Sequence, residues 1–220
     1  MGVNYTSDAR IADEVVAKIE TAGGKAFAVK AEVSNEADVI AMFDEVTNRL
    51  GALSGYVGNA GINLPKSNLV DMTAERMTRI FSVNAIGAYL CVREAARRMA
   101  VSKGSKGGVI VNVSSVAARI GSPNEYVDYA GSKAAVDAMT LGLSKELGPD
   151  GIRVNAVRPG LIETEIHVAA GDPDRISRTA SAIPLGRAGS PDEVAQAVIW
   201  LLSDKASYVN WALVDVGGGR

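Results

Sequence analysis

Two short apolar runs, with a helical pattern between them, limit most strongly how this chain can fold. Residues 108–115 (Gly-Val-Ile-Val-Asn-Val-Ser-Ser) and 152–157 (Ile-Arg-Val-Asn-Ala-Val) are rich in β-branched residues and have the length of buried strands. Between them, apolar residues recur at helical spacing from about 128 to 147, and Gly148-Pro149 ends the pattern. Strand, helix and strand form a βαβ unit, and ligands in open parallel sheets bind outside the carboxyl ends of the strands.

A tyrosine and a lysine four positions apart lie at the start of the predicted helix of this unit. Tyr129 and Lys133 share one helix face, so their side chains can approach each other. A free phenol titrates near pH 10, and a neighbouring ammonium group favours the phenolate, so we expect Lys133 to lower the pKa of Tyr129. Such a pair suits general acid/base catalysis. Taken alone, the same spacing also fits an ordinary tyrosine and a solvated lysine.

The rest of the chain continues the alternation of strands and helices, with no linker and no internal repeat. Strands are predicted at about 1–5, 25–31, 53–57 and 212–216, and helices at about 8–21, 34–50, 73–100 and 190–202. Ser34 is the predicted cap of the second helix, and Ser190-Pro-Asp-Glu193 is a capping box for the last one. The chain is therefore predicted to be one α/β domain over residues 1–220, with a doubly wound parallel sheet.

Two features of this pattern need a reason of their own. Asn84 falls inside the predicted helix 73–100, where a buried asparagine must be hydrogen-bonded, and a structural role and a functional role are both open. Residues 161–189 break the alternation with Gly171, Pro173 and Pro184 among charged residues. Long irregular segments in compact domains are usually functional, so we expect a lid over the substrate, the alternative being a surface loop.

Composition excludes several classes of function. A net charge of −2 argues against nucleic acid or an anionic membrane as the main partner, and 47% apolar with 22% charged residues is typical of a globular domain. Cys91 is the only cysteine and His167 the only histidine, so an internal disulfide is impossible and no metal site is expected. With no signal peptide and no long apolar run, a cytoplasmic location is expected.

Motifs along the whole chain resemble those of the short-chain dehydrogenase/reductase family. They are Asn59-Ala-Gly61 after a strand, Asn84 in Val-Asn-Ala-Ile-Gly, Ser115, Tyr129-x-x-x-Lys133, Pro159-Gly160 followed by Thr164, and the terminal Asp215-Val-Gly-Gly-Gly219. The resemblance implies a Rossmann-like fold. It also implies an oxidoreductase that transfers a hydride between a nicotinamide cofactor and an alcohol or carbonyl substrate, such as a sugar or keto compound.

The same resemblance assigns roles to four catalytic residues. Tyr129 would be the general acid/base, and Lys133 would hold the cofactor ribose and lower the pKa of the tyrosine. Ser115 would bind the reacting oxygen, with Ser114 as the alternative, and Asn84 would anchor a water molecule in a proton relay.

The resemblance further implies cofactor contacts and a homotetramer. The expected contacts are Asn4, Tyr5, Glu32, Val33, Asn59, Ala60, Gly61, Tyr129, Lys133, Pro159, Gly160, Ile162 and Thr164. The predicted strand 1–5 is followed by Thr6 and Ser7 rather than by an acid that would bind the ribose 2′-hydroxyl, which favours NADP over NAD.

One family feature is not found in this sequence. Such folds begin with a strand, a Gly-rich turn and a helix whose N-terminus binds the pyrophosphate, and residues 1–5 correspond instead to the second strand of the family. We therefore expect a sheet that lacks this first, central strand, two edges without a partner, and poor affinity for NADPH. The alternative function is a non-catalytic remnant that binds no cofactor.

Overall fold

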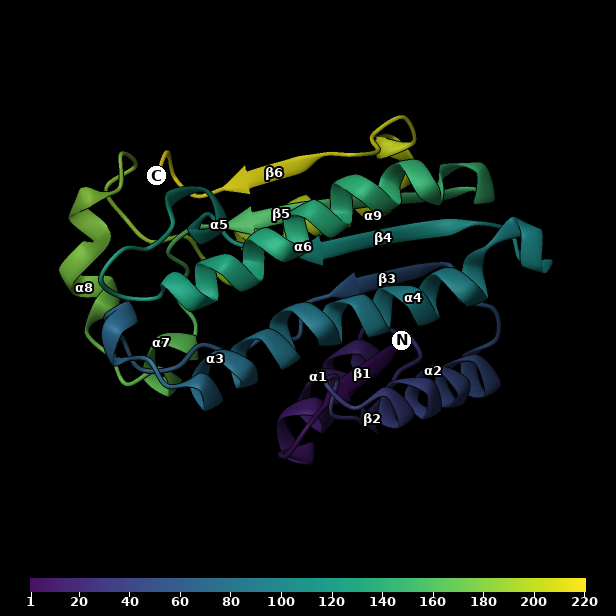
Figure 1. The fold of residues 1–220 in the computed structure, drawn as a ribbon. Helices are drawn as coiled ribbons and strands as arrows, with labels where there is room; N and C mark the ends of the chain where they lie inside the picture. The colour runs from purple at the N-terminus through teal and green to yellow at the C-terminus, as the bar shows by residue number, and fades with distance from the viewer.

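A computed structural model describes residues 1–220, except for the side chains of His167 and Ala169. The expectation that His167, the only histidine, forms no metal site or catalytic triad concerns a side chain outside the described residues. The protein has parallel strands flanked by helices on both faces, so the predicted fold class is confirmed (Figure 1).

Four strands form the larger sheet, in the order β3-β4-β5-β6. They are β3 (Gly55–Gly58), β4 (Gly108–Val113), β5 (Ile152–Pro159) and β6 (Leu213–Val216), and every neighbouring pair is parallel. Successive residues of β4 point to opposite faces, and Ile110 and Val111 are both fully buried. Both faces of this sheet are therefore covered, as the continuous apolar runs predicted.

Helices from distant parts of the chain cover the two faces of this sheet (Figure 1). Helices α4 (Ala88–Met99) and α6 (Val127–Glu146) pack on the face that carries Ile110 and Val154. Helix α9 (Pro191–Leu202) packs on the opposite face, where Leu201 joins the core with Val111 and Val157. The predicted capping box is present, because the Ser190 hydroxyl accepts from the Glu193 amide and the Glu193 carboxylate accepts from the Ser190 amide.

The first two strands form a separate sheet. Strand β1 (Gly2–Tyr5) pairs in parallel with β2 (Phe27–Lys30), followed by helices α1 (Ala9–Thr21) and α2 (Glu36–Leu50), respectively. Among the described residues, no ladder joins β1 to β3. Side chains make the connection instead: Phe27 and Val29 lie in the same core cluster as residues of α4 and β4. The prediction of Ser34 as a helix cap is wrong, because Asn35 caps α2 and Ser34 bonds to Glu32 instead.

The long helix predicted over 73–100 is interrupted in the middle. It consists of α3 (Ala74–Phe81), a π-helical segment (Ser82–Gly87) and α4, which follow one another without a break. Short 3₁₀ turns occur at Leu69–Asp71, Val101–Lys103, Gly148–Asp150, Ala180–Ala182 and Asp204–Ala206. Single-turn π segments inside α-helices occur often at functional sites, and this one contains Asn84.

Residues 161–189 are less irregular than expected. They contain the short helices α7 (Ile166–Ala169) and α8 (Arg175–Thr179). A parallel bridge between Ile162 and Gly189 joins the two ends of the segment, so it starts and ends at neighbouring positions in the fold. Another short helix, α5 (Ala117–Ile120), follows β4. Within the described residues, no helix combines the length and the apolar character that a membrane crossing needs.

Candidate active site

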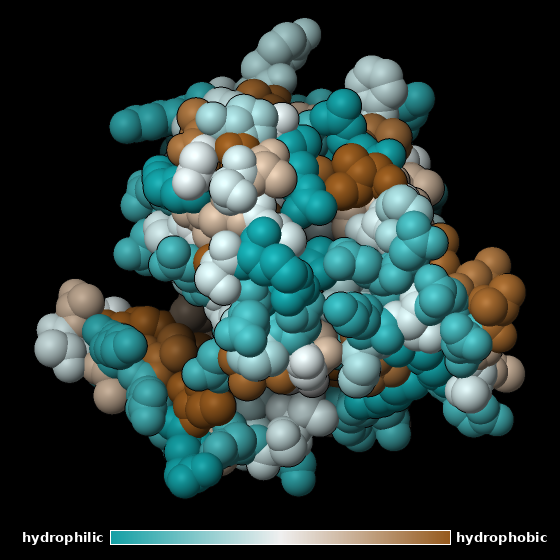
Figure 2. All heavy atoms as spheres, turned by 90° about the vertical axis from the view of Figure 1, so that its left-hand side faces the viewer, coloured by the Kyte–Doolittle hydropathy of each residue, from teal (hydrophilic) through white to brown (hydrophobic). Residues whose placement is uncertain are grey.

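The main pocket lies beyond the carboxyl ends of β3, β4 and β5. Its volume is about 580 Å³, and its walls include residues that follow each of these strands together with residues of α6 and of the 161–189 segment. Figure 2 shows this end of the molecule, where hydrophobic residues border a notch in a largely hydrophilic surface. The pocket therefore occupies the position where open parallel sheets bind ligands.

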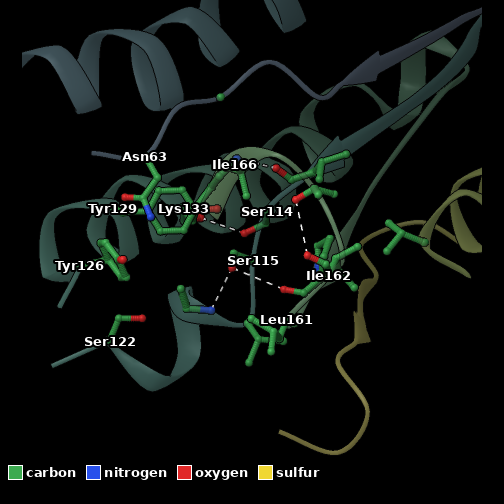
Figure 3. A pocket seen from close by; sticks show the side chains of 18 of the residues that line it. Asn63, Ser114, Ser115, Ser122, Tyr126, Tyr129, Lys133, Leu161, Ile162 and Ile166 are labelled. Atoms are coloured by element: carbon green, nitrogen blue, oxygen red, sulfur yellow. Dashed lines mark hydrogen bonds between the residues drawn. The ribbon is translucent and has the colours of Figure 1, made fainter. Parts of the chain in front are cut away.

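The first turns of α6 bring Tyr129 and Lys133 into the pocket wall (Figure 3). An ion pair fixes this end of the helix: Asp128 accepts from Arg76 Nε at 2.7 Å and from the Tyr129 amide at 2.9 Å. Lys133 Nζ lies 5.8 Å from the centre of the Tyr129 ring and donates to the Val113 carbonyl at 2.8 Å. The helix thus places the two side chains side by side, at the end of β4.

The pKa values of this pair differ from the expectation. Burial lowers the pKa of Lys133 to about 8, against a smaller opposite effect of Asp137. Burial raises the pKa of Tyr129, and the Ser115 hydroxyl offsets only part of this effect. The expected lowering of the Tyr129 pKa is therefore wrong for this structure, because burial disfavours the phenolate and also weakens the charge of the lysine. At neutral pH the phenol is protonated and can donate.

The two serines after β4 have different surroundings. The Ser114 hydroxyl is buried and donates to the Lys133 carbonyl at 3.1 Å, which ties β4 to α6. Ser115 is half-buried, and its hydroxyl accepts from the Ala117 amide at 3.1 Å and lies 3.4 Å from the Pro159 carbonyl. Both serines line the pocket, and Ser115 is the one whose hydroxyl acts on the side chain of Tyr129. This geometry favours Ser115 as the partner of the reacting oxygen.

Asn84 lies behind the pocket wall rather than on it. It is 1% exposed, and its amide accepts from the Ile62 amide at 2.7 Å and donates to the Ile62 carbonyl at 2.9 Å. It also donates to Ser132 Oγ at 3.1 Å. These bonds join the π-helical segment to α6 and to the loop after β3. The geometry accounts for a structural role, and the relay role stays a prediction.

The loops after β3 and β5 supply most of the other expected cofactor contacts. Among the predicted residues, the pocket is lined by Asn59, Gly61, Ser115, Tyr129, Lys133, Pro159, Gly160, Ile162 and Thr164. Gly61 allows a close approach here, because a Cβ would lie 3.2 Å from Lys133 Nζ and 3.3 Å from Asn84 Oδ1. Ala60 is exposed and is not among the described lining residues.

Four predicted contacts lie away from this pocket. The Asn4 amide donates to the Ala31 carbonyl at 3.0 Å, and Tyr5 pairs with Lys30 in the small sheet. Glu32 is paired with Arg79, and Val33 is buried. None of the four is among the described residues that line the pocket. Their role toward a cofactor stays a prediction.

The structure also adds lining residues that the sequence analysis did not single out. Ser122 and Tyr126 precede α6, and Arg220 lines the same pocket. Tyr126 could have been found from sequence, since it stands three positions before Tyr129 and next to the start of the predicted helix. In the described part of the chain, no three His, Cys, Asp or Glu side chains converge in a way that could hold a metal ion.

Comparisons with known proteins agree with this geometry. The family model described as enoyl-(acyl carrier protein) reductase matches residues 2–220. The oxidoreductase YgfF of Escherichia coli is 51% identical over 220 residues, covering 100% of this chain and 89% of that protein. Glucose 1-dehydrogenase 2 of Bacillus subtilis is 37% identical, over 99% of this chain and 83% of that protein.

A solved structure extends the agreement to three dimensions. The short-chain type dehydrogenase/reductase of Mycobacterium marinum has a TM-score of 0.91 and 34% identity, and the match covers 99% of this chain and 84% of that one. Members of this family work with a nicotinamide cofactor. The chain therefore belongs to the short-chain dehydrogenase/reductase family and is an enzyme of the oxidoreductase class.

Proposed function

We propose that the protein reduces a carbonyl compound or oxidises the corresponding alcohol, with Tyr129 as the general acid and base. The observation that carries this proposal is the meeting of Ser115, Tyr129 and Lys133 in one pocket, at the carboxyl ends of parallel strands. The glucose dehydrogenase activity in the name of the Bacillus relative is consistent with an alcohol or carbonyl substrate.

The pocket fits the nicotinamide end of a cofactor. Gly61 keeps open the space beside Lys133, which a Cβ would fill, and the loops Asn59–Gly61 and Pro159–Gly160 frame the same space. Lys133 and these loops would hold the nicotinamide and its ribose. When bound, the nicotinamide supplies or accepts the hydride.

The residues of the chain then have separate tasks at the substrate oxygen. The Ser115 hydroxyl orients the oxygen, and Tyr129, protonated at neutral pH, donates its proton to it during reduction. In the opposite direction Tyr129 must first be deprotonated. Because burial raises the Tyr129 pKa, alcohol oxidation should speed up with rising pH, and carbonyl reduction should slow above the pKa.

We also propose that NADP is preferred over NAD and that the protein is a homotetramer. Strand β1 ends at Tyr5 and is followed by Thr6 and Ser7, so no carboxylate stands there to repel a 2′-phosphate. The next acid, Asp8, caps α1 and is paired with Arg10. The tetramer rests on the resemblance to the family alone.

The test is Tyr129→Phe, which keeps the ring and removes the proton donor. Turnover should fall about 10²- to 10⁴-fold while NADPH affinity, which is expected to be low and is followed by nicotinamide fluorescence, stays equal to that of the wild type. Tyr208→Phe is the matched control, because Tyr208 is fully exposed. Ser115→Ala should reduce turnover more than Ser114→Ala. Wild-type turnover in Tyr129→Phe across the pH range would end the proposal.

A further inference from the structure

Two polar groups in the wall of the pocket have no hydrogen-bond partner. They are the hydroxyl of Tyr126 and Nη1 of Arg175, and both residues line the pocket that contains Tyr129. Tyr126 is 3% exposed and Arg175 is 8% exposed. Buried polar groups are nearly always hydrogen-bonded, so two such groups in one cavity wall indicate that a ligand supplies the missing partner.

The remaining atoms of Arg175 are held firmly. Its Nη2 donates to Glu125 Oε2 at 2.9 Å, and its guanidinium lies 4.8 Å from the centre of the Tyr126 ring. Nη1 is 3.8 Å from Asp172 Oδ2, too far for a hydrogen bond. Asp172 bonds instead to Arg178 at 2.6 Å. Arg175 is therefore fixed in place, and both N–H groups of its Nη1 are without a hydrogen bond.

The charge around Arg175 is already balanced. The carboxylates of Glu125 and Asp172 face the guanidinium groups of Arg175 and Arg178 in one cluster. A carboxylate on the ligand would add a third negative group close to the other two. What the site lacks is a hydrogen-bond acceptor and not a negative charge. Burial raises the pKa of Tyr126, against a smaller opposite effect of the neighbouring Arg175, so its hydroxyl stays protonated and is also available as a donor.

The two groups stand next to the reacting end of the pocket. Tyr126 immediately precedes α6, three positions before Tyr129. Figure 3 shows Tyr126 and Ser122 on the same side of the pocket as Tyr129, with Leu161 and Ile162 on the other side. Arg175 begins α8 in the segment predicted as a substrate lid. A molecule whose carbonyl meets Tyr129 and Ser115 would reach Tyr126 and Arg175 with a different part.

We propose that Tyr126 and Arg175 bind a second, uncharged oxygen of the substrate, a hydroxyl or carbonyl group away from the reacting carbon. The substrate class is then a hydroxyketone, a diketone or the corresponding polyol. This assignment rests on the proposed function, because it takes the Tyr129 end of the pocket as the reacting end. It makes the two residues determinants of specificity, and neither takes part in the chemistry.

The experiment compares carbonyl compounds that have the same shape but differ in the second oxygen. The pairs are 4-hydroxycyclohexanone with 4-methylcyclohexanone, and 5-hydroxypentan-2-one with hexan-2-one; 4-oxocyclohexanecarboxylate tests a charged group. The wild type should prefer the hydroxy member of at least one pair, by roughly 10-fold in kcat/KM, and should prefer it to the carboxylate as well. Tyr126→Phe and Arg175→Lys should each remove most of this preference.

Controls separate specificity from folding. Tyr208→Phe and Arg49→Lys are the matched variants: Tyr208 is fully exposed, and Arg49 pairs with Glu45 on α2 without lining the pocket. Both should keep the wild-type preference. Tyr126→Phe removes a hydroxyl that has no partner, so its Tm should be equal to or above that of the wild type. An unchanged preference in folded Tyr126→Phe and Arg175→Lys would overturn the proposal, as would a wild type that favours the methyl compounds or the carboxylate.

A second measurement keeps this inference separate from the proposed function. The rise in Tm caused by each compound is measured with NADPH present in Tyr129→Phe, which cannot donate the proton. A larger rise with the hydroxy member, lost on adding Tyr126→Phe, supports the second oxygen site even if no compound is turned over by the wild type. Equal rises for both members refute it even if turnover is observed.

Discussion

Lys133 carries a charge in a place where a charge is unfavourable, and this gives the protein a specific dependence of stability on pH. The side chain is 4% exposed, and its Nζ bonds to the Val113 carbonyl. Asp137, one turn further along α6, is the charged group that acts on it. Burial nevertheless dominates, and the pKa falls from 10.5 to about 8.

The sign follows from proton binding in the two states. Below about pH 8 the lysine is charged in both states, and the folded protein bears the full cost of burying the charge. Between about pH 8 and 10.5 the unfolded chain holds a proton that the folded protein has released, so stability increases with pH. At about 1.4 kcal/mol for each pH unit, the whole effect is roughly 3 kcal/mol.

A buried thiol acts in the opposite direction at slightly higher pH. Burial raises the pKa of Cys91 from 9.0 to about 11, so the unfolded chain loses this proton first and stability falls between about pH 9 and 11. Burial also raises the pKa of Tyr129 and of Tyr56 above 10, which adds to the decline there. The wild type should therefore gain about 0.6 kcal/mol from pH 8 to 9, because Lys133 is only partly titrated at pH 8 and Cys91 begins to act, and then level off.

The assay is urea unfolding without cofactor, at half-unit steps from pH 7.5 to 9.5, for the wild type, Lys133→Met and Cys91→Ala. The free energy of unfolding of the wild type relative to Lys133→Met should increase by about 1 kcal/mol for each pH unit between 8 and 9.5. In Cys91→Ala the free energy of unfolding should continue to increase above pH 9, because the thiol that offsets Lys133 is gone. If the difference between wild type and Lys133→Met is the same at every pH, Lys133 does not have a lowered pKa, and the reasoning fails.

Two further variants test contacts described in the structure. Asn84→Ala removes three hydrogen bonds of a buried amide and should lower the free energy of unfolding by about 3 kcal/mol in urea; a loss below about 1 kcal/mol would mean that these bonds contribute little. Gly107→Ala should lower the free energy of unfolding more than Gly104→Ala in the same assay. Both glycines have a positive φ near 80–90°, but only at Gly107 would an added Cβ overlap the Gly151 carbonyl. Equal losses of stability in the two variants would show that the positive φ, and not the contact with Gly151, determines the effect of the substitution.

Local patterns were enough to predict most of the architecture. The βαβ unit follows from two β-branched runs and one helical period, and the structure has it as β4, α6 and β5. The capping box at Ser190 depends only on residues that are close in sequence, and it was predicted correctly. The helix cap at Asn35 was assigned one residue too early, because Ser34 is an equally good cap by residue type. The Ser34 hydroxyl bonds to Glu32 instead of to the helix, and this contact cannot be read from residue type.

The candidate site could be predicted where it depends on spacing and not where it depends on environment. Tyr129 and Lys133 share a helix face by their spacing, so their proximity was predictable. The direction of the Tyr129 pKa was not, since it depends on burial by segments far apart in the chain. In the same way, the charge of Arg175 is visible in the sequence, but its unpaired Nη1 depends on how Glu125, Asp172 and Arg178 are arranged around it.

The π-helical segment Ser82–Gly87 has a consequence for the rotational phase of the helix that contains it. A π turn holds more residues than an α turn, so the segment acts as an inserted residue. Each residue of an α-helix turns the chain by about 100° around the axis, and the wider π turn absorbs this extra rotation, so a single deletion that restores regular α geometry would keep α3 in nearly the same phase relative to α4. Ile80, which is fully buried, and Arg76, which bonds to Asp128 at the start of α6, would keep their faces. The π turn therefore lets the helix hold one extra residue without turning α3, and a one-residue deletion within the segment should disturb the bonds of Asn84 more than the orientation of α3.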